Sequence, residues 1–347
     1  ILDYGDYSGP GGARMLLRDK RLQVAFLEVA RGGILRRGLP LRQAQAALVT
    51  NVAADHLGQY GVNTVEELAV AKFSVHRTLA ANGVLVLNAD DEYVRAEVTR
   101  TQAILCWFSL NPAHPLITQA KTKGHTCAWQ EGDHLVYFDG TKAYPVVNVK
   151  DIPISMGGAA DYNIRNALGA LCLAKVMNID NKAIALGLCN FKNDAKDNPG
   201  RCNEFAIKGA RVFVDFAHNP HSISAVTDAM AGVPAKRRFI MISHAGDRSD
   251  QDILDATQSA LALNPDFLMA AELPQYLRGR ELGETLRLTH QQAIKHGLKT
   301  HQLLVAEGPA AGAKQILSQL QEGDLALLLV LSERDQVFAM LDPALTH

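Results

Sequence analysis

The chain has 347 residues, 48% of them hydrophobic, which is enough for roughly two domains with large cores and excludes disordered and collagen-like chains. The formal net charge is −1, with 35 Lys and Arg against 36 Asp and Glu, so no one-sided basic surface indicates nucleic-acid binding. No apolar stretch approaches ~18 residues and the start lacks a secretory signal, so we expect a soluble, cytoplasmic protein without a membrane segment.

The first part of the chain alternates short apolar runs with helix-length stretches, as βαβ units do. The candidate strands are Leu22–Val29, Ala46–Val52 and Val84–Asn88. From about 107 to 155 the segments become short and bounded by turns, which predicts a small antiparallel addition at the edge of a parallel sheet. A long helix is expected from about Tyr162 to Met177.

After Pro199 the alternation of strands and helices starts again. The candidate strands are Arg211–Asp215, Arg237–Ile242, Asp266–Met269, Gln302–Val305 and Leu325–Leu331. This pattern predicts a second, doubly wound α/β domain. We therefore expect domains at 1–198 and 199–347, with binding residues where the strands end.

The five cysteines are odd in number, widely spaced and without a CxxC pair. This pattern argues against a disulfide framework and against structural zinc. We expect them to be small core residues.

Two candidate polar residues follow the first predicted strands. Glu28 would end the strand from Leu22 and could hold Mg²⁺, or else cap a helix or pair with Arg31. His56, in the loop after Thr50-Asn51, would lie beside Glu28 if the two strands are neighbours; a structural hydrogen bond is the alternative.

Lys72 carries the strongest argument of any single residue. Thr64 and Glu67 have the spacing of a capping box and start a helix predicted to stop near Gly83. Lys72 lies on the apolar stripe of that helix, four residues after Leu68. Burial lowers the pKa of a lysine, and a neutral amine can add CO₂ to become a carbamate that binds Mg²⁺. The alternative is a lysine that snorkels to water.

The remaining candidates are amides, an arginine and an aspartate. Asn163 and Asn166 share one face of the long helix and suit an adenine edge, a phosphate or a helix cap. Arg201, after Asn198-Pro199-Gly200, could reach a phosphate. Asp215, which opens Asp215-Phe216-Ala217-His218-Asn219-Pro220, could bind a ribose hydroxyl or a cation, or cap the next helix.

Taken together, these motifs resemble the Mur ligase superfamily. The motifs that carry the resemblance are Glu28, Thr50 to His56, Ala71-Lys72, Asn88-Ala89-Asp90-Asp91, Asn163 to Asn166, Arg201 and Asp215 to Pro220. Within it, Ala30 to Gly38, Gly246-Asp247-Arg248, Leu277 to Arg280 and Leu331 to Arg334 resemble the ligase domain of the cyanophycin synthetase subfamily.

The resemblance implies a parallel-sheet ATPase domain followed by a Rossmann-like domain. It also implies a cytoplasmic ligase that uses ATP and Mg²⁺ to join an amino acid, here arginine, to aspartate side chains of a polyaspartate acceptor through an acyl phosphate. Glu28, His56 and a carbamylated Lys72 would hold the metal. The residues that would contact ATP are Asn163, Asn166, Arg201, Asp215, His218 and Asn219.

No G-x-x-x-x-G-K-[ST] loop and no G-x-G-x-x-G occurs in the chain, and Gly9-Pro10-Gly11-Gly12 is interpreted as a turn. The family's phosphate-binding loop precedes the region where this sequence starts, and the sequence starts at Ile1 rather than Met. We therefore expect a truncated chain that is inactive alone.

Other readings stay open. The chain could be another Mur-like ligase, for peptidoglycan precursors or polyglutamate, or an inactive module that binds polymer or a partner. Selection of arginine would require acids, and Asp247, Glu281 and Glu333 are candidates by loop position. A homo-oligomer is also left open.

Overall fold

The computed structural model describes residues 7–55 and 57–345 and divides the chain into two compact units. The first unit consists of the described residues up to Asp151 and of Tyr162–Leu188. The second consists of Ile152–Asp161 and of the described residues from Cys189 onward. A short segment before the long helix thus belongs to the second unit, and the domain boundary predicted at 198/199 stays a prediction.

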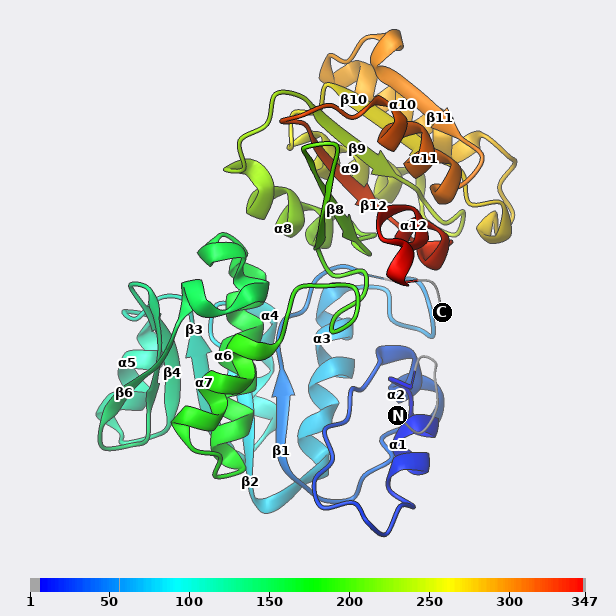
Figure 1. The fold of residues 1–347 in the computed structure, drawn as a ribbon. Coiled ribbons are helices and arrows are strands. Elements are labelled where there is room, and N and C mark those ends of the chain that lie inside the picture. The colour runs from blue at the N-terminus through cyan, green and yellow to red at the C-terminus, as the bar shows by residue number, and fades with distance from the viewer. Residues whose placement is uncertain (1–6, 56, 346–347) are drawn as a thin grey trace. The chain divides into compact units, whose positions relative to one another are not determined.

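The first unit is built on a six-stranded sheet in the order β1-β2-β3-β4-β5-β6 (Figure 1). Its strands are β1 (Ala44–Val49), β2 (Leu79–Asn88), β3 (Ile104–Ser109), β4 (Cys127–Glu131), β5 (His134–Phe138) and β6 (Ala143–Asn148). The first four pair in parallel, and β4, β5 and β6 pair antiparallel. Because β1 pairs with β2 alone among the described strands, β1 is an edge strand.

Helices cover both faces of this sheet. The helices of the first unit are α1 (Pro10–Leu16), α2 (Arg31–Arg37), α3 (Val65–Phe73), α4 (Glu92–Ala96), α5 (Pro115–Thr122), α6 (Asp161–Val176) and α7 (Asn181–Asn190), of which α2 packs against α3. One face packs Leu85 and Leu87 against a core that includes Leu68 of α3. On the other face, Gly169 of α6 lies against Leu48 of β1. The α3 face and the α6 face are therefore opposite sides of the sheet, because side chains alternate along a strand.

The second unit has a six-stranded sheet in the order β11-β10-β9-β12-β8-β7. Its strands are β7 (Asn203–Ile207), β8 (Ala210–Asp215), β9 (Arg238–Ile242), β10 (Phe267–Ala271), β11 (Leu303–Ala306) and β12 (Leu325–Leu329). All pairings are parallel except β7 with β8. Its helices are α8 (Pro220–Ala231), α9 (Asp250–Leu261), α10 (Glu284–His296), α11 (Pro309–Gln319) and α12 (Arg334–Leu341).

The central strand β12 shows why this order forms. All five residues of Leu325–Leu329 are buried. A continuous apolar run is typical of a parallel strand with both faces covered. On one face, Leu328 belongs to a core that contains Ile316 of α11 and Phe338 of α12. The predicted doubly wound domain is confirmed, with strand ends displaced by one or two residues.

Seven 3₁₀ helices connect these elements within the described residues: Ser74–Thr78, Glu97–Arg100, Val149–Asp151, Pro153–Gly158, Pro274–Tyr276, Thr300–Gln302 and Pro343–Leu345. Among the described residues no helix has the length and hydropathy needed to span a bilayer. The cysteines are free thiols, and Cys106, Cys127, Cys172 and Cys202 are buried, as expected for core residues.

Two sequence predictions about local structure are wrong. The predicted strand at Leu22–Val29 is an extended segment without strand pairing, in which Val24 is 50% and Phe26 63% exposed. A strand exists only through its ladder of hydrogen bonds, and β1 has no other described partner than β2.

The helix predicted from Thr64 to near Gly83 is also shorter than expected. It ends at Phe73, a 3₁₀ turn follows, and β2 begins at Leu79. Leu79 and Val84 pair with Ala44 and Ala46 of β1 across a bulge. Pairing with a distant strand therefore overrides the helical periodicity after Lys72.

Candidate functional site

The capping box that starts α3 is present and holds Lys72 in the last turn of this helix. The backbone N–H of Glu67 donates to Thr64 Oγ1 at 3.2 Å, and the backbone N–H of Thr64 donates to Glu67 Oε2 at 3.3 Å. This reciprocal pair fixes where the helix begins and therefore on which side Lys72 lies.

The Lys72 amine is half-buried at the carboxyl end of β1. Its Nζ donates a hydrogen bond of 3.4 Å to the backbone oxygen of Asn51. Burial lowers the pKa of Lys72, and the positive charge of Arg31 adds to this, while the carboxylates of Asp55 and Asp91 oppose it. A lower pKa makes the neutral amine, the form that can react with CO₂, more accessible.

The two aspartates that follow β2 join the ends of neighbouring strands. Asp91 accepts at Oδ2 from the N–H of Val52, after β1, and at Oδ1 from the N–H of Val94, where it caps α4. Asp90 accepts from Ser109 Oγ, at the last residue of β3, and from the N–H of Leu110, directly after this strand. The Asn88 to Asp91 motif thus connects three strand ends beside Lys72.

Within the described residues, no contact brings Glu28 or His56 to Lys72. Glu28 is exposed in the unpaired segment before α2 and makes no hydrogen bond or ion pair within residues 7–55 and 57–345. His56 lies outside the described residues. The described part of the chain contains no group of three His, Cys, Asp or Glu residues that could hold a metal ion. The predicted metal set therefore stays a prediction.

The two asparagines of α6 lie together. Asn166 Nδ2 donates to Asn163 Oδ1 at 3.3 Å, with Asn163 buried and Asn166 exposed. Arg165, between them, reaches the Asp90 carboxylate at 3.4 Å. The helix therefore presents its amide pair on the first unit, beside the strand end held by Asp90.

In the second unit, Asp215 is the last residue of β8 and is 5% exposed. Burial raises its pKa to about 6, against hydrogen bonds from the backbone, including that of Ala217 at 2.6 Å, and the charge of Arg201. A carboxylate with a raised pKa at a strand end gains from any ligand that donates hydrogen bonds to its charged form.

The residues after Asp215 have a clear local structural role. Asn219 caps α8 by accepting from the N–H of Ser222 at 2.9 Å. The alternative that Asp215 caps this helix is therefore wrong, because Asp215 accepts from the N–H of Ala217 before the helix begins. The ring of His218 lies edge-on to the ring of Phe216, 5.4 Å between centroids. Its Nδ1 is 3.0 Å from the backbone oxygen of Phe216.

Arg201 follows a turn that brings it to the same place. Gly200 has φ +74° and donates its N–H to Asn203 Oδ1 at 2.7 Å. The Arg201 guanidinium lies 5.9 Å from the ring centroid of Phe216. Arg201 and Asp215 are therefore neighbours in the second unit, whereas Asn163 and Asn166 belong to the first.

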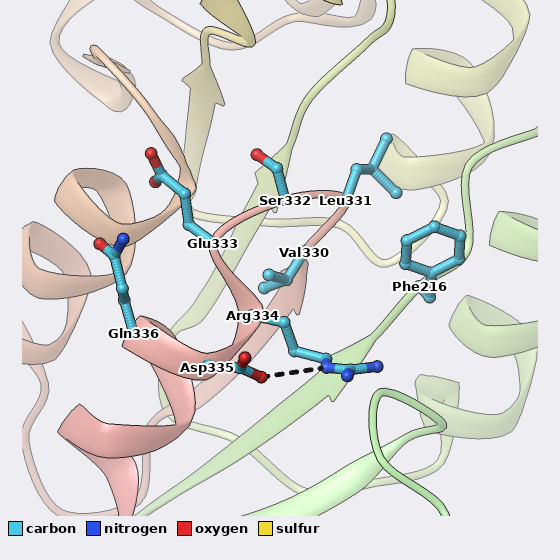
Figure 2. Close-up of a pocket in the computed structure, with 8 residues that line it drawn as sticks. All are labelled: Phe216, Val330, Leu331, Ser332, Glu333, Arg334, Asp335 and Gln336. Carbon is cyan, nitrogen blue, oxygen red and sulfur yellow. Dashed lines mark ion pairs between the residues drawn. The ribbon is translucent and has the colours of Figure 1, made fainter. Parts of the chain in front are cut away.

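A cavity of about 310 Å³ opens beside Phe216. Figure 2 shows the residues that line it, which are Phe216, the loop 330–333 after β12 and the first three residues of α12, Arg334, Asp335 and Gln336. Arg334 belongs to this lining, and a Cβ on Gly200 would lie 3.4 Å from its Cδ. Sequence reasoning gave Arg334 and Phe216 no individual role, although both stand in motifs that carry the family resemblance. The signal from the residues alone was weak, because it consisted only of a position after a predicted strand.

Two of the three acids considered for arginine selection are bound within the protein. Glu333, with φ +58°, accepts at Oε2 from the N–H of Ala310 at 2.8 Å, at the start of α11. Asp247 forms an ion pair with Arg278. Glu281 is exposed, and its carboxylate has no partner within the described part of the chain.

Two family models match most of the chain. The Mur ligase middle domain matches residues 12–174, and the model described as "Mur ligase, glutamate ligase domain" matches residues 200–329.

Among curated proteins, the cyanophycin synthetase of Trichormus variabilis is 35% identical over 288 residues, 83% of this chain and 32% of that protein. That of Synechocystis is 36% identical over 287 residues, again 83% and 32%. The chain therefore spans about a third of the length of these relatives.

Solved structures share the fold. MurF from Acinetobacter baumannii has a TM-score of 0.66 at 17% identity, covering 97% of this chain and 69% of that one. Escherichia coli FolC, in complex with DHPP and ADP, has a TM-score of 0.64 at 17% identity, covering 90% and 64%.

Proposed function

The chain belongs to the Mur ligase family, and we propose that it is the ligase portion of an enzyme that joins arginine to the aspartate side chains of a polyaspartate acceptor. Three observations support the proposal: the family of the chain, its similarity to cyanophycin synthetases at 35–36% identity, and the site around Lys72. The observation that carries it is the half-buried Lys72 amine with a lowered pKa at the end of β1.

The proposed reaction has two steps. The acceptor carboxylate attacks the γ-phosphorus of ATP, which releases ADP and forms an acyl phosphate. The amine of arginine then attacks the acyl carbon, an amide bond forms, and phosphate leaves together with a proton. Two anions approach in the first step, so cationic groups must offset their repulsion.

In this proposal residues of the first unit hold the metal, and residues of both units contact the nucleotide. Glu28, His56 and carbamylated Lys72 would bind Mg²⁺, which would polarise the transferred phosphoryl group. The carbamate would turn a cationic side chain into an anionic oxygen ligand. Support for this role of Lys72 comes from its burial and its lowered pKa.

The proposed nucleotide contacts are Asn163, Asn166, Arg201, Asp215, His218 and Asn219. Asp215 would accept from ribose hydroxyls, which would stabilise the charged form that burial disfavours. Arg201 would contact a phosphate. Because Asn219 Oδ1 accepts from the N–H of Ser222, the NH₂ group of that side chain is the part that would donate to a ligand.

Release of ADP by the intact protein, measured with a polyaspartate acceptor and one amino acid at a time, tests the proposal. Arginine should support release, whereas lysine, glutamate and alanine should not. Release with glutamate or alanine instead would indicate a different Mur-like ligase. No release with any of the four would favour a module that binds polymer without turning over ATP.

A further inference from the structure

A basic and aromatic cluster lies on the first unit next to α3. The guanidinium carbon of Arg31 lies 5.9 Å from the ring centroid of Tyr60, and that of Arg36 lies 5.6 Å from it. Arg31 and Arg36 are on α2, while Tyr60 is on the loop between β1 and α3. Two segments of the chain thus bring two positive charges to one ring. We call these three residues the Tyr60 cluster.

The backbone holds Tyr60 in an unusual conformation. Gln59 and Val62 form an antiparallel bridge, and the two residues between them, Tyr60 and Gly61, have φ of +55° and +77°. Positive φ at both central residues is typical of a type I′ turn, which favours Asn or Gly and is strained for a bulky side chain. Tyr60 is 54% exposed, so burial does not offset this strain. A strained, exposed aromatic residue indicates a functional role.

Both arginines of the cluster are oriented by hydrogen bonds, and the charge of Arg36 has no ion pair within the described residues. Arg31 Nη2 donates to Gln59 Oε1 at 3.0 Å, and Arg36 Nε donates to the backbone oxygen of Gly32 at 3.0 Å. Within residues 7–55 and 57–345, Arg36 and the adjacent Arg37 have no ion pair, and the two terminal nitrogens of Arg36 make no hydrogen bond. Like charges held close together gain from an anion placed between them.

The cluster lies near the predicted reaction centre and away from the amide pair. The charge of Arg31 acts on Lys72, and α2 packs against α3. Asn163 and Asn166 are on α6, which covers the opposite face of the sheet. An anion bound at the Tyr60 cluster would therefore approach Lys72 from the α3 face.

We propose that Arg31, Arg36 and Tyr60 form a binding site for carboxylates of the acidic acceptor chain that neighbour the reacting carboxylate. This inference rests on the proposed function and names the surface that holds one of its substrates. A planar guanidinium fork matches a carboxylate in two parallel hydrogen bonds, and the ring keeps the fork oriented. An acceptor with a carboxylate on every residue always offers a neighbour to such a site.

Binding of dye-labelled poly-L-aspartate of about ten residues, measured by fluorescence anisotropy, tests the proposal directly. Arg36→Gln should weaken binding about tenfold, and Arg36→Glu should weaken it further. Arg18→Gln is the matched control, because Arg18 is an exposed arginine without a side-chain bond in the described residues. Tyr60→Asn, which tolerates positive φ, should weaken polymer binding, because the ring is lost. Tyr60→Phe, which keeps the ring, should bind the polymer as the parent does.

Steady-state kinetics distinguish a site for the acceptor from a site for the nucleotide. In the intact protein, Arg36→Gln should raise the KM for the acceptor about tenfold and leave kcat and the KM for ATP within about twofold, because a remote contact contributes binding alone. Unchanged polymer binding in Arg36→Gln, or a raised KM for ATP in place of the acceptor, overturns the inference. Polymer binding that depends on Arg36 without any arginine-dependent ADP release overturns the proposed reaction and leaves the site standing.

Discussion

The two units each place an ionisable side chain at the carboxyl ends of parallel strands, and they do so by opposite routes. In the first unit Lys72 reaches the end of β1 from a neighbouring helix and stays half-buried. In the second unit Asp215 is the last residue of β8 itself and is 5% exposed. Burial is the largest cause of the pKa shift in both, lowering that of Lys72 and raising that of Asp215.

The two sites differ in how each ionisable side chain becomes negatively charged. Both environments disfavour charge, so the lysine is moved toward a neutral nucleophile and the aspartate toward a proton-binding acid. Under the proposed function, the lysine gains an anionic group by reacting with CO₂. The aspartate recovers its charge when a ligand donates hydrogen bonds to it. One site is completed by covalent chemistry and the other by binding.

Removing the lysine tests the first half of this comparison and should have the largest effect. We expect Lys72→Ala to lower arginine-dependent ADP release in the intact protein by about a thousandfold or more, because an anionic metal ligand is lost. Bicarbonate or acetate should restore part of the activity by supplying a carboxylate. Full activity of Lys72→Ala without any addition would remove this residue from the mechanism.

Asp215→Asn tests the second half through two measurements. The amide keeps an acceptor for the N–H of Ala217 but removes the buried charge, so we expect ADP affinity, measured by titration calorimetry, to fall about tenfold. Unaltered affinity would separate Asp215 from the nucleotide.

The pH dependence of the free energy of unfolding tests the direction of the pKa shift of Asp215. Because the pKa of Asp215 rises from 3.8 to about 6 on folding, its protonation stabilises the fold at acidic pH. That contribution, roughly 2 to 3 kcal/mol, is lost as the pH rises from about 4 to about 6. In denaturant titrations Asp215→Asn should therefore be more stable than the parent at pH 7.5 and lose this advantage near pH 4. An advantage that is independent of pH would contradict the buried charge.

A smaller effect is expected at Asp91, which connects the ends of neighbouring strands in the first unit by hydrogen bonds. Asp91→Ala removes a helix cap and the bond to the N–H of Val52, so we expect a loss of roughly 1 to 2 kcal/mol in the free energy of unfolding. Asp91→Asn, which keeps one acceptor, is the matched control and should lose less. Equal losses in both variants would show that the charge, and not the cap, is what matters.

The smallest effect is expected at Glu333. Its carboxylate accepts from the N–H of Ala310, so Glu333→Gln should cost at most about 1 kcal/mol and leave the preference for arginine unchanged. A switch in the preferred amino acid, measured by ADP release, would return Glu333 to the substrate pocket.

Local signals predicted much of this fold. The Thr64 and Glu67 capping box starts α3 as expected, and the leucine-rich run at 325–329 is the central strand of the second sheet. Short turn-bounded segments predicted an antiparallel addition, and β4, β5 and β6 pair antiparallel. Each of these signals is contained in about ten neighbouring residues.

The missed features depend on contacts between distant residues. The segment 22–29 has the composition of a strand but no described partner, and composition does not reveal the partner. Glu333 has the loop position of a specificity residue, yet it caps a helix 23 residues earlier in the chain. Similarly, the Tyr60 cluster joins two helical arginines to a turn that follows a strand.

Asp90 and Asp91 impose a further condition on the connection after β2. Consecutive residues send their carboxylates to opposite neighbours, one toward the loop after β3 and the other toward the loop after β1. One residue inserted between Asn88 and Glu92 would displace at least one of these carboxylates from its partner and break that link. This connection should therefore tolerate a change of side chain far better than a change of length, so insertions and deletions should be rarer there than substitutions.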